Sequence, residues 1–181
     1  MRLFTAIDLP AEAVGNLERL LARLRPAARI KWVAAANIHL TTKFIGEWPD
    51  GRLRELREAL GGLPRREPID VALRGLGVFP NARAPRVFWV GIEAPPGLAE
   101  LAGETDRALG RLGAPPESRP FAPHLTLARI REPVPLEALW QAIAQLPSVE
   151  FGQFRADRFY LYRSQLTPSG SVYTRLSEFG L

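Results

Sequence analysis

Two short segments of the sequence carry side chains suited to acid–base chemistry. The chain has only two histidines, His39 and His124, and each begins an H-L-T triplet. Residues two apart in a strand share a face, so His39 would lie beside Thr41, and His124 beside Thr126. An imidazole exchanges protons near neutral pH, and a threonine hydroxyl can donate a hydrogen bond to an anionic oxygen. The two triplets therefore predict cleavage of a phosphoryl ester, with one histidine as base and the other as acid.

A metal centre is the rival interpretation of the two histidines. Zinc takes three or four ligands, usually including thiolate or carboxylate, and neither triplet contains a cysteine or an acidic residue. We therefore expect neither a metal nor a cofactor. In a regular strand Lys43 would share the face of His39 and supply a positive charge for a bound phosphate.

The composition narrows the class of protein. The 181 residues include no cysteine, which excludes disulfides, thiolate nucleophiles and iron–sulfur clusters. There are 24 basic and 19 acidic residues, and all but two of the basic residues are arginine, which matches phosphate geometry well. Asp8 and Pro10 interrupt the apolar run that a signal peptide needs, and no run is long enough to span a membrane. We expect a cytoplasmic protein without membrane contact.

Hydrophobic periodicity and turn residues predict the elements that position the triplets. The expected strands are 2–8, 30–33, 38–46, 69–79, 86–92, 122–130, 149–163 and 171–178. The expected helices span 10–26, 50–62, 95–112 and 135–146.

These elements follow the same order twice. An R-x-F strand, a proline and an H-L-T triplet recur at a nearly constant offset, with Pro95 standing 85 positions after Pro10. We interpret residues 1–181 as a single domain of two similar units, about 1–84 and 85–181, related by approximate two-fold symmetry. The sheets of the two units would then lie side by side, with both histidines facing a central cleft.

Three longer segments resemble a known family. They are RLFTAIDLP at 2–10, NIHLTTKFIGE at 37–47 and RPFAPHLTLARI at 119–130. With the matching length and spacing, the sequence is similar over essentially its whole length to the RNA 2′,3′-cyclic phosphodiesterases. This family is also called 2′-5′ RNA ligases or LigT-like proteins and belongs to the 2H phosphoesterases. The resemblance implies a bilobal α+β fold in which two mainly antiparallel sheets face a water-filled cleft.

The resemblance also implies an activity: hydrolysis of an RNA-terminal 2′,3′-cyclic phosphate to a 2′-phosphate without a metal. Carried over by position, His39 would protonate the departing 3′ oxygen and His124 would activate the attacking water. Thr41 and Thr126 would hold the non-bridging phosphate oxygens. The family often has an arginine five residues after the second histidine, and Arg129 matches it.

Strand geometry leaves the source of positive charge open. An odd offset places Arg129 opposite His124 in a regular strand, so a bulge or a strong twist is needed to bring its side chain round. Lys43 needs no such distortion.

Three other functions stay open on the sequence. The same chemistry run backwards would join RNA halves through a 2′-5′ linkage. A binding module would use the histidines only to contact RNA phosphate, and an enzyme for small cyclic nucleotides would share the same motifs. In each RNA case the partner is an RNA end, no protein partner is needed, and a monomer is expected.

Overall fold

The computed structural model describes residues 1–168 and 170–181. Its strands are β1 (Arg2–Ile7), β2 (Lys31–Trp32), β3 (Leu40–Glu47), β4 (Ile69–Phe79), β5 (Val87–Glu93), β6 (His124–Arg129), β7 (Glu150–Ala156), β8 (Arg158–Thr167) and β9 (Gly170–Gly180). Its α-helices are α1 (Ala11–Leu24), α2 (Leu53–Gly61), α3 (Gly97–Gly110) and α4 (Glu137–Ala144). Single 3₁₀ turns are η1 (Arg25–Ala27), η2 (Ala35–Asn37) and η3 (Asp50–Arg52).

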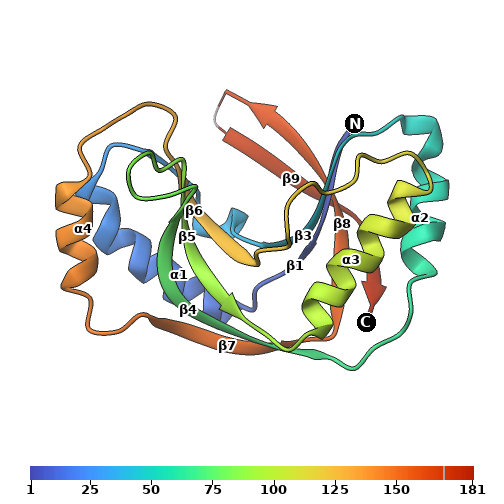
Figure 1. The fold of residues 1–181 in the computed structure, drawn as a ribbon, viewed down its shortest axis with the longest axis horizontal. Coiled ribbons are helices and arrows are strands. Elements are labelled where there is room, and N and C mark those ends of the chain that lie inside the picture. Colours follow the sequence, from blue (N-terminus) through green and yellow to red (C-terminus); the bar gives the residue numbers. More distant parts are fainter. Residues whose placement is uncertain (169) are drawn as a thin grey trace.

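The strands form two antiparallel sheets, which confirms the predicted α+β class with two lobes. The first sheet has the order β3-β1-β8-β9, and the second has the order β2-β6-β5-β4-β7. Helices α2 and α3 lie beside the first sheet, whereas α1 and α4 lie on the outer side of the second (Figure 1). The first H-L-T triplet runs into β3, and the second begins β6. Each of these strands pairs with an inner strand of its sheet, since β3 pairs with β1 and β6 pairs with β5.

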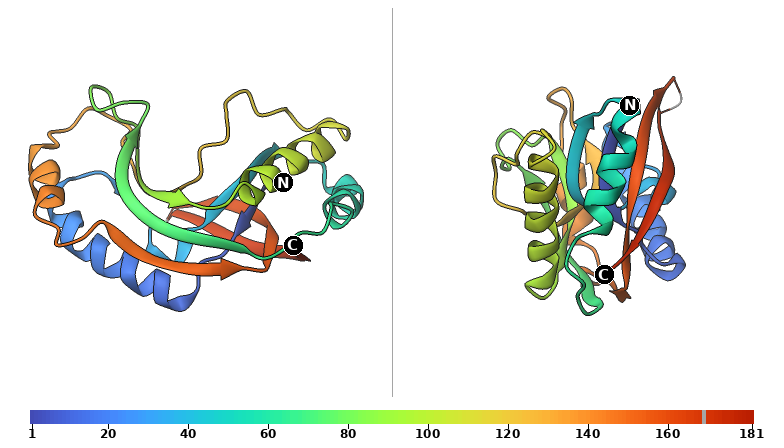
Figure 2. Two further views of the ribbon diagram at one scale, coloured as in Figure 1. Left: turned by 60° about the horizontal axis from the view of Figure 1, so that its bottom comes forward. Right: turned by 90° about the vertical axis from the view of Figure 1, so that its right-hand side faces the viewer.

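Each sheet draws strands from both halves of the sequence. Strand β4 belongs to the first half but pairs with β5, and β8 belongs to the second half but pairs with β1. The lobes are thus built by an exchange of equivalent strands. Figure 2 shows β4 and β7 as long curved strands that reach from one lobe towards the other.

The predicted single strand over 149–163 is wrong. The chain forms two strands there, with β7 paired to β4 in one sheet and β8 paired to β1 in the other. Only Asp157 separates them, and its carbonyl accepts a hydrogen bond from the amide of Leu181. Because a single residue separates the two strands, no cluster of turn residues marks this change of sheet in the sequence.

The helices bury the stripes that periodicity predicts. In α1 the fully or nearly fully buried residues are Ala13, Leu17, Leu20, Leu21 and Leu24. Truncating a buried leucine such as Leu17 to alanine would cost about 2–5 kcal/mol, so these stripes hold the helices against the sheets.

No helix in the described part of the chain is long and apolar enough to cross a membrane.

Candidate active site

The two histidines are held by matching backbone hydrogen bonds. Nδ1 of His39 lies 2.9 Å from the carbonyl oxygen of Asn37, and Nδ1 of His124 lies 2.7 Å from that of Ala122. A ring nitrogen that faces a carbonyl must carry the proton and donate it, which leaves Nε2 of each ring available for chemistry. When neutral, Nε2 accepts a proton, and when the ring is charged, Nε2 donates one. Either histidine can therefore act as base or acid at the same atom.

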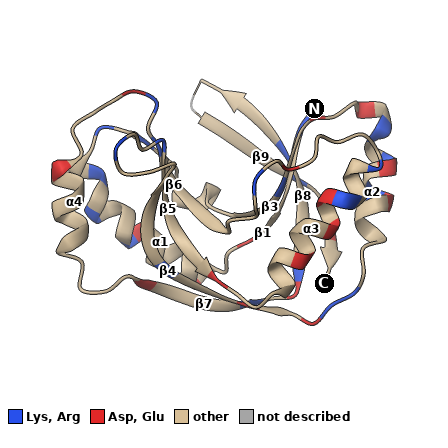
Figure 3. Cartoon of the chain, viewed as in Figure 1, with Lys and Arg blue, Asp and Glu red and all other residues tan. Residues whose placement is uncertain are grey.

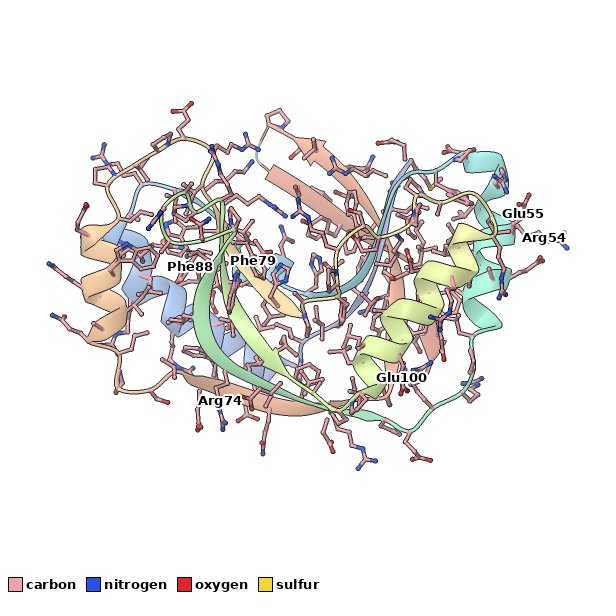
Figure 4. All side chains as sticks on the ribbon, viewed as in Figure 1. Arg54, Glu55, Arg74, Phe79, Phe88 and Glu100 are labelled. Carbon is pink, nitrogen blue, oxygen red and sulfur yellow. The ribbon has the colours of Figure 1, made fainter. Side chains whose placement is uncertain are left out.

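Aromatic rings fix the plane of each imidazole. The ring of Phe4 stacks on His39 at a centroid distance of 4.6 Å, and Tyr173 meets the same imidazole edge-on at 5.2 Å. Phe79 meets His124 edge-on at 5.0 Å. Phe79 is the last residue of β4 and lies on the side of that strand towards the middle of the molecule (Figure 4). Each imidazole is thus restrained by a carbonyl and an aromatic ring.

His39 has a pKa below its ordinary value. Burial is the largest cause, because it disfavours the charged imidazolium. The carbonyl of Asn37 and the carboxylate of Asp8 oppose this effect and raise the pKa, whereas the charges of Arg129 and His124 lower it further. His39 belongs to one lobe and Arg129 and His124 to the other, so these electrostatic effects act across the cleft.

The threonines lie on the histidine faces, as predicted. Thr126 lies opposite Trp89, and His124 lies opposite Gly91, two residues further along the same partner strand. Thr41 lies opposite Ala6 in the first sheet, on the face from which Phe4 stacks against the first histidine.

Arg129 lies on the same face of β6 as His124 and Thr126 because β6 contains a bulge. Thr126 pairs with Trp89, whereas Arg129 pairs with Val87, which leaves Leu127 as an extra residue on β6. Trp89 and Val87 are two residues apart and share a face, so their partners do as well. The bulge that the sequence required for Arg129 is therefore present.

A matching bulge in β3 has the opposite consequence for Lys43. Thr41 pairs with Ala6 and Lys43 pairs with the adjacent Thr5, so Thr42 is the extra residue. Adjacent residues of β1 point to opposite faces, and so do their partners. The prediction that Lys43 shares the face of the first histidine is wrong.

The ammonium of Lys43 is instead bound inside the protein. Its side chain is 3% exposed, and Nζ lies 2.6 Å from a carboxylate oxygen of Asp106 in α3. Nζ also donates to the carbonyl of Pro115 at 2.7 Å, and Asp106 accepts a 3.0 Å hydrogen bond from the amide of Glu117. This pair anchors the segment that leads from α3 to His124.

A cavity of about 800 Å³ opens beside the site. Thr41 and His124 lie at its wall, and the segment after α3 covers it. Its lining is mainly apolar and includes three aromatic side chains and two arginines: Phe44, Phe79, Phe121, Arg86 and Arg119. The cavity has the size and lining of a site for a nucleoside-sized ligand.

Sequence reasoning missed the residues that surround His39. Asp8 accepts a 2.7 Å hydrogen bond from the hydroxyl of Tyr162 and an ion pair from Arg175, and it raises the pKa of His39. Its only local signal is its position as the acidic residue that ends an apolar strand. Tyr173 has no local signal at all, since it reaches His39 from β9.

In the described ranges, no group of three histidine, cysteine or acidic residues could hold a metal ion.

Two antiparallel sheets, each carrying one H-L-T triplet, form the fold of a LigT-like phosphoesterase. The chain belongs to the LigT-like phosphoesterase family, whose model matches residues 7–89 and again residues 90–173.

Named relatives match the whole chain. A protein of Methanothermobacter thermautotrophicus named RNA 2′,3′-cyclic phosphodiesterase is 37% identical, covering 100% of this chain and 99% of that protein. A Thermus thermophilus protein of the same name is 36% identical, covering 100% of this chain and 90% of that protein.

Solved structures agree with the fold. A crystal structure of a Thermus thermophilus protein superposes with a TM-score of 0.84 at 36% identity, covering 100% of this chain and 98% of that one. The crystal structure of E. coli LigT complexed with 3′-AMP has a TM-score of 0.81 at 31% identity, covering 99% of this chain and 97% of that one.

Proposed function

We propose that the protein hydrolyses the 2′,3′-cyclic phosphate at the 3′ end of an RNA to a 2′-phosphomonoester. The observation that carries the proposal is the matched pair of imidazoles, each donating from Nδ1 to a backbone carbonyl and leaving Nε2 free. The name and length of the relatives, and the 3′-AMP bound by E. coli LigT, support a ribonucleotide substrate.

The reaction needs one proton acceptor and one proton donor. Nε2 of His124 removes a proton from a water molecule as its oxygen attacks phosphorus. The bond between phosphorus and the 3′ oxygen breaks, and Nε2 of His39 donates a proton to that oxygen. The product keeps its phosphate on the 2′ oxygen. His124 then releases its proton to solvent and His39 takes one up, which restores the starting protonation state of both residues.

Neutral and charged donors would hold the phosphate between the histidines. The hydroxyls of Thr41 and Thr126 lie on the histidine faces, where they can donate to the non-bridging oxygens. Arg129 adds a guanidinium on the face of His124. Lys43 is left out of this set, because Asp106 and Pro115 already bind its ammonium.

The low pKa of His39 fits a proton donor that acts only with substrate bound. In the free protein, burial disfavours the imidazolium. A bound phosphodiester brings a negative charge, which favours the imidazolium and offsets the effect of burial. Once protonated, a group of low pKa gives up its proton readily to the departing oxygen.

The test is the identity of the product from one defined oligonucleotide that ends in a 2′,3′-cyclic phosphate, incubated in the presence of a chelator. We expect a terminal 2′-monophosphate at an undiminished rate. A 3′-monophosphate would show that the proton goes to the other oxygen, and loss of activity with chelator would show a metal requirement. A 2′-5′ linked product would show ligation instead. Both histidines come from one chain, so the site needs no second subunit to complete it, and we propose a monomer that acts in the cytoplasm.

A further inference from the structure

Five exposed basic residues meet at the end of the second sheet where β6 ends and β5 begins. We call them the basic rim: Lys31, Arg83, Arg86, Arg129 and Arg131. In Figure 3 the blue segments of the loops above β5 and β6 mark this region.

Backbone and side-chain contacts show that the members of the basic rim are neighbours. Lys31 lies opposite Arg129 in the pairing of β2 with β6. The guanidinium of Arg86 donates to the carbonyl of Arg131 at 2.8 Å, and the carbonyl of Arg86 accepts from the amide of Ile130 at 2.8 Å. Arg83 lies in the turn before Arg86, where its amide donates to the side chain of Asn81. The rim is therefore one continuous patch on two strands and two loops.

The charges of the basic rim have no acidic partners. Several arginines elsewhere form ion pairs, as Arg54 does with Glu58 and Arg158 with Glu178. Within residues 1–168 and 170–181, none of the five rim side chains lies within ion-pair distance of a carboxylate. Unpaired like charges on adjacent strands repel one another, so an anionic ligand would relieve the repulsion.

The rim leads away from the site in one direction. Arg129 shares the face of His124, and Arg86 lines the cavity beside the same histidine. Arg83 and Arg131 lie further out on the loops. A cyclic phosphate is the 3′ end of its strand, so all other phosphates of the RNA lie on its 5′ side and leave the cleft along one path.

We propose that the basic rim binds the backbone phosphates of the nucleotides that precede the cyclic phosphate, so that the preferred substrate is an oligoribonucleotide and not a single nucleotide. Arginine suits this role because its planar guanidinium binds phosphate through two parallel hydrogen bonds. This inference rests on the proposed function, since it extends the substrate outward from the same site.

The test compares substrates of increasing length. The kcat/KM is measured for a nucleoside 2′,3′-cyclic phosphate and for oligonucleotides of two, four and eight nucleotides with the same 3′ end. The variant is Arg83→Gln/Arg131→Gln, which leaves the residues at the reacting phosphate in place. The control is Arg54→Gln/Arg111→Gln, which removes two charges from exposed positions on the other lobe; Arg54 lies on the outer side of α2 (Figure 4).

For the unmodified protein, we expect kcat/KM to rise with length and to fall with added salt. The kcat/KM of the rim variant should fall roughly tenfold or more with the longer substrates. Its kcat/KM with the mononucleotide should be unchanged. Its slope of log kcat/KM against log salt should be shallower by about 1.4, because single strands contribute about 0.7 for each phosphate neutralised. The control variant should behave like the unmodified protein.

Three results would overturn the inference. The first is that the rim variant loses as much kcat/KM with the mononucleotide as with the oligonucleotides, and the second is that it loses none with the oligonucleotides. The third is that the control variant loses as much as the rim variant, which would indicate an effect of net charge and not a binding site. Failure of the proposed function gives a different result, because then neither the mononucleotide nor any oligonucleotide is hydrolysed. In that case, fluorescence anisotropy with a labelled eight-nucleotide RNA still tests the rim, since only the rim variant should bind it more weakly.

Discussion

The ammonium of Lys43 and the carboxylate of Asp106 form an ion pair of 2.6 Å in which the lysine side chain is almost fully buried. Burial opposes ionisation of Asp106, yet hydrogen bonds from Lys43 and from the amide of Glu117 hold the pKa of that carboxyl below its ordinary value. The pair joins β3, which carries one triplet, to the segment that leads to the other.

Removing one member of this pair should destabilise the protein strongly. Lys43→Met would leave the partly exposed Asp106 without its ammonium partner, and we expect the free energy of unfolding to fall by roughly 1–3 kcal/mol. The double variant Lys43→Met/Asp106→Leu replaces both charges with apolar groups and should recover most of this loss. Urea denaturation measures both effects. A double variant as unstable as the single one would contradict the assignment of the loss to an unpaired charge.

The pH dependence of kcat/KM should be bell-shaped, with two limbs that belong to the coupled histidine pair. Burial lowers the pKa of His39 below its ordinary value, so the limb to which this residue contributes most should lie at lower pH than for an exposed imidazole. Asp8→Asn removes a charge that raises this pKa, so the limb should move to lower pH. Arg129→Gln removes a charge that lowers it, so the limb should move to higher pH.

Titration by NMR checks these shifts independently of turnover, because the chain has only two imidazoles to assign. The matched control is Tyr162→Phe, which removes the hydrogen bond to Asp8 but keeps the carboxylate. Shifts of the His39 titration in the same direction for Asp8→Asn and Arg129→Gln would disprove the electrostatic account.

Replacement of either histidine should abolish most of the activity. We expect His39→Gln and His124→Gln each to lower the rate about 10²–10⁴-fold, the usual contribution of a general acid or base. Their effects should not add in the double variant, since each histidine acts only when the other is present. Single-turnover kinetics with a cyclic-phosphate oligonucleotide measures the chemical step. A rate within a few-fold of normal in either single variant is the result that would exclude the pair.

Gly91 is required where β5 passes close to β4. A Cβ at this position would lie 2.5 Å from the backbone carbonyl oxygen of Arg74, which cannot move without breaking the sheet. Gly91→Ala should therefore lower the free energy of unfolding by about 1–3 kcal/mol. Gly110→Ala is the control, because nothing lies within 4 Å of a Cβ there, and its stability should be unchanged or higher. Equal stabilities of the two variants in thermal denaturation would contradict this prediction.

The sequence by itself identified the family, the α+β class and the two triplets. These features are local: alternation along a strand places a histidine and the threonine two residues later on one face. The repeat then indicates that the two triplets occupy equivalent places. The exchange of β4 and β8 between the sheets is not local, because β7 and β8 follow one another without a turn and differ only in the strand with which they pair.

Only the tertiary structure decided which basic side chain joins the site. The bulges at Thr42 and Leu127 lie at equivalent points of the repeat, and each reverses the facing of the residues that follow. They bring Arg129 onto the face of the second histidine and turn Lys43 away from the first, towards Asp106. A bulge is defined by the register between two strands that are distant in sequence, so alternation along either strand alone cannot reveal it.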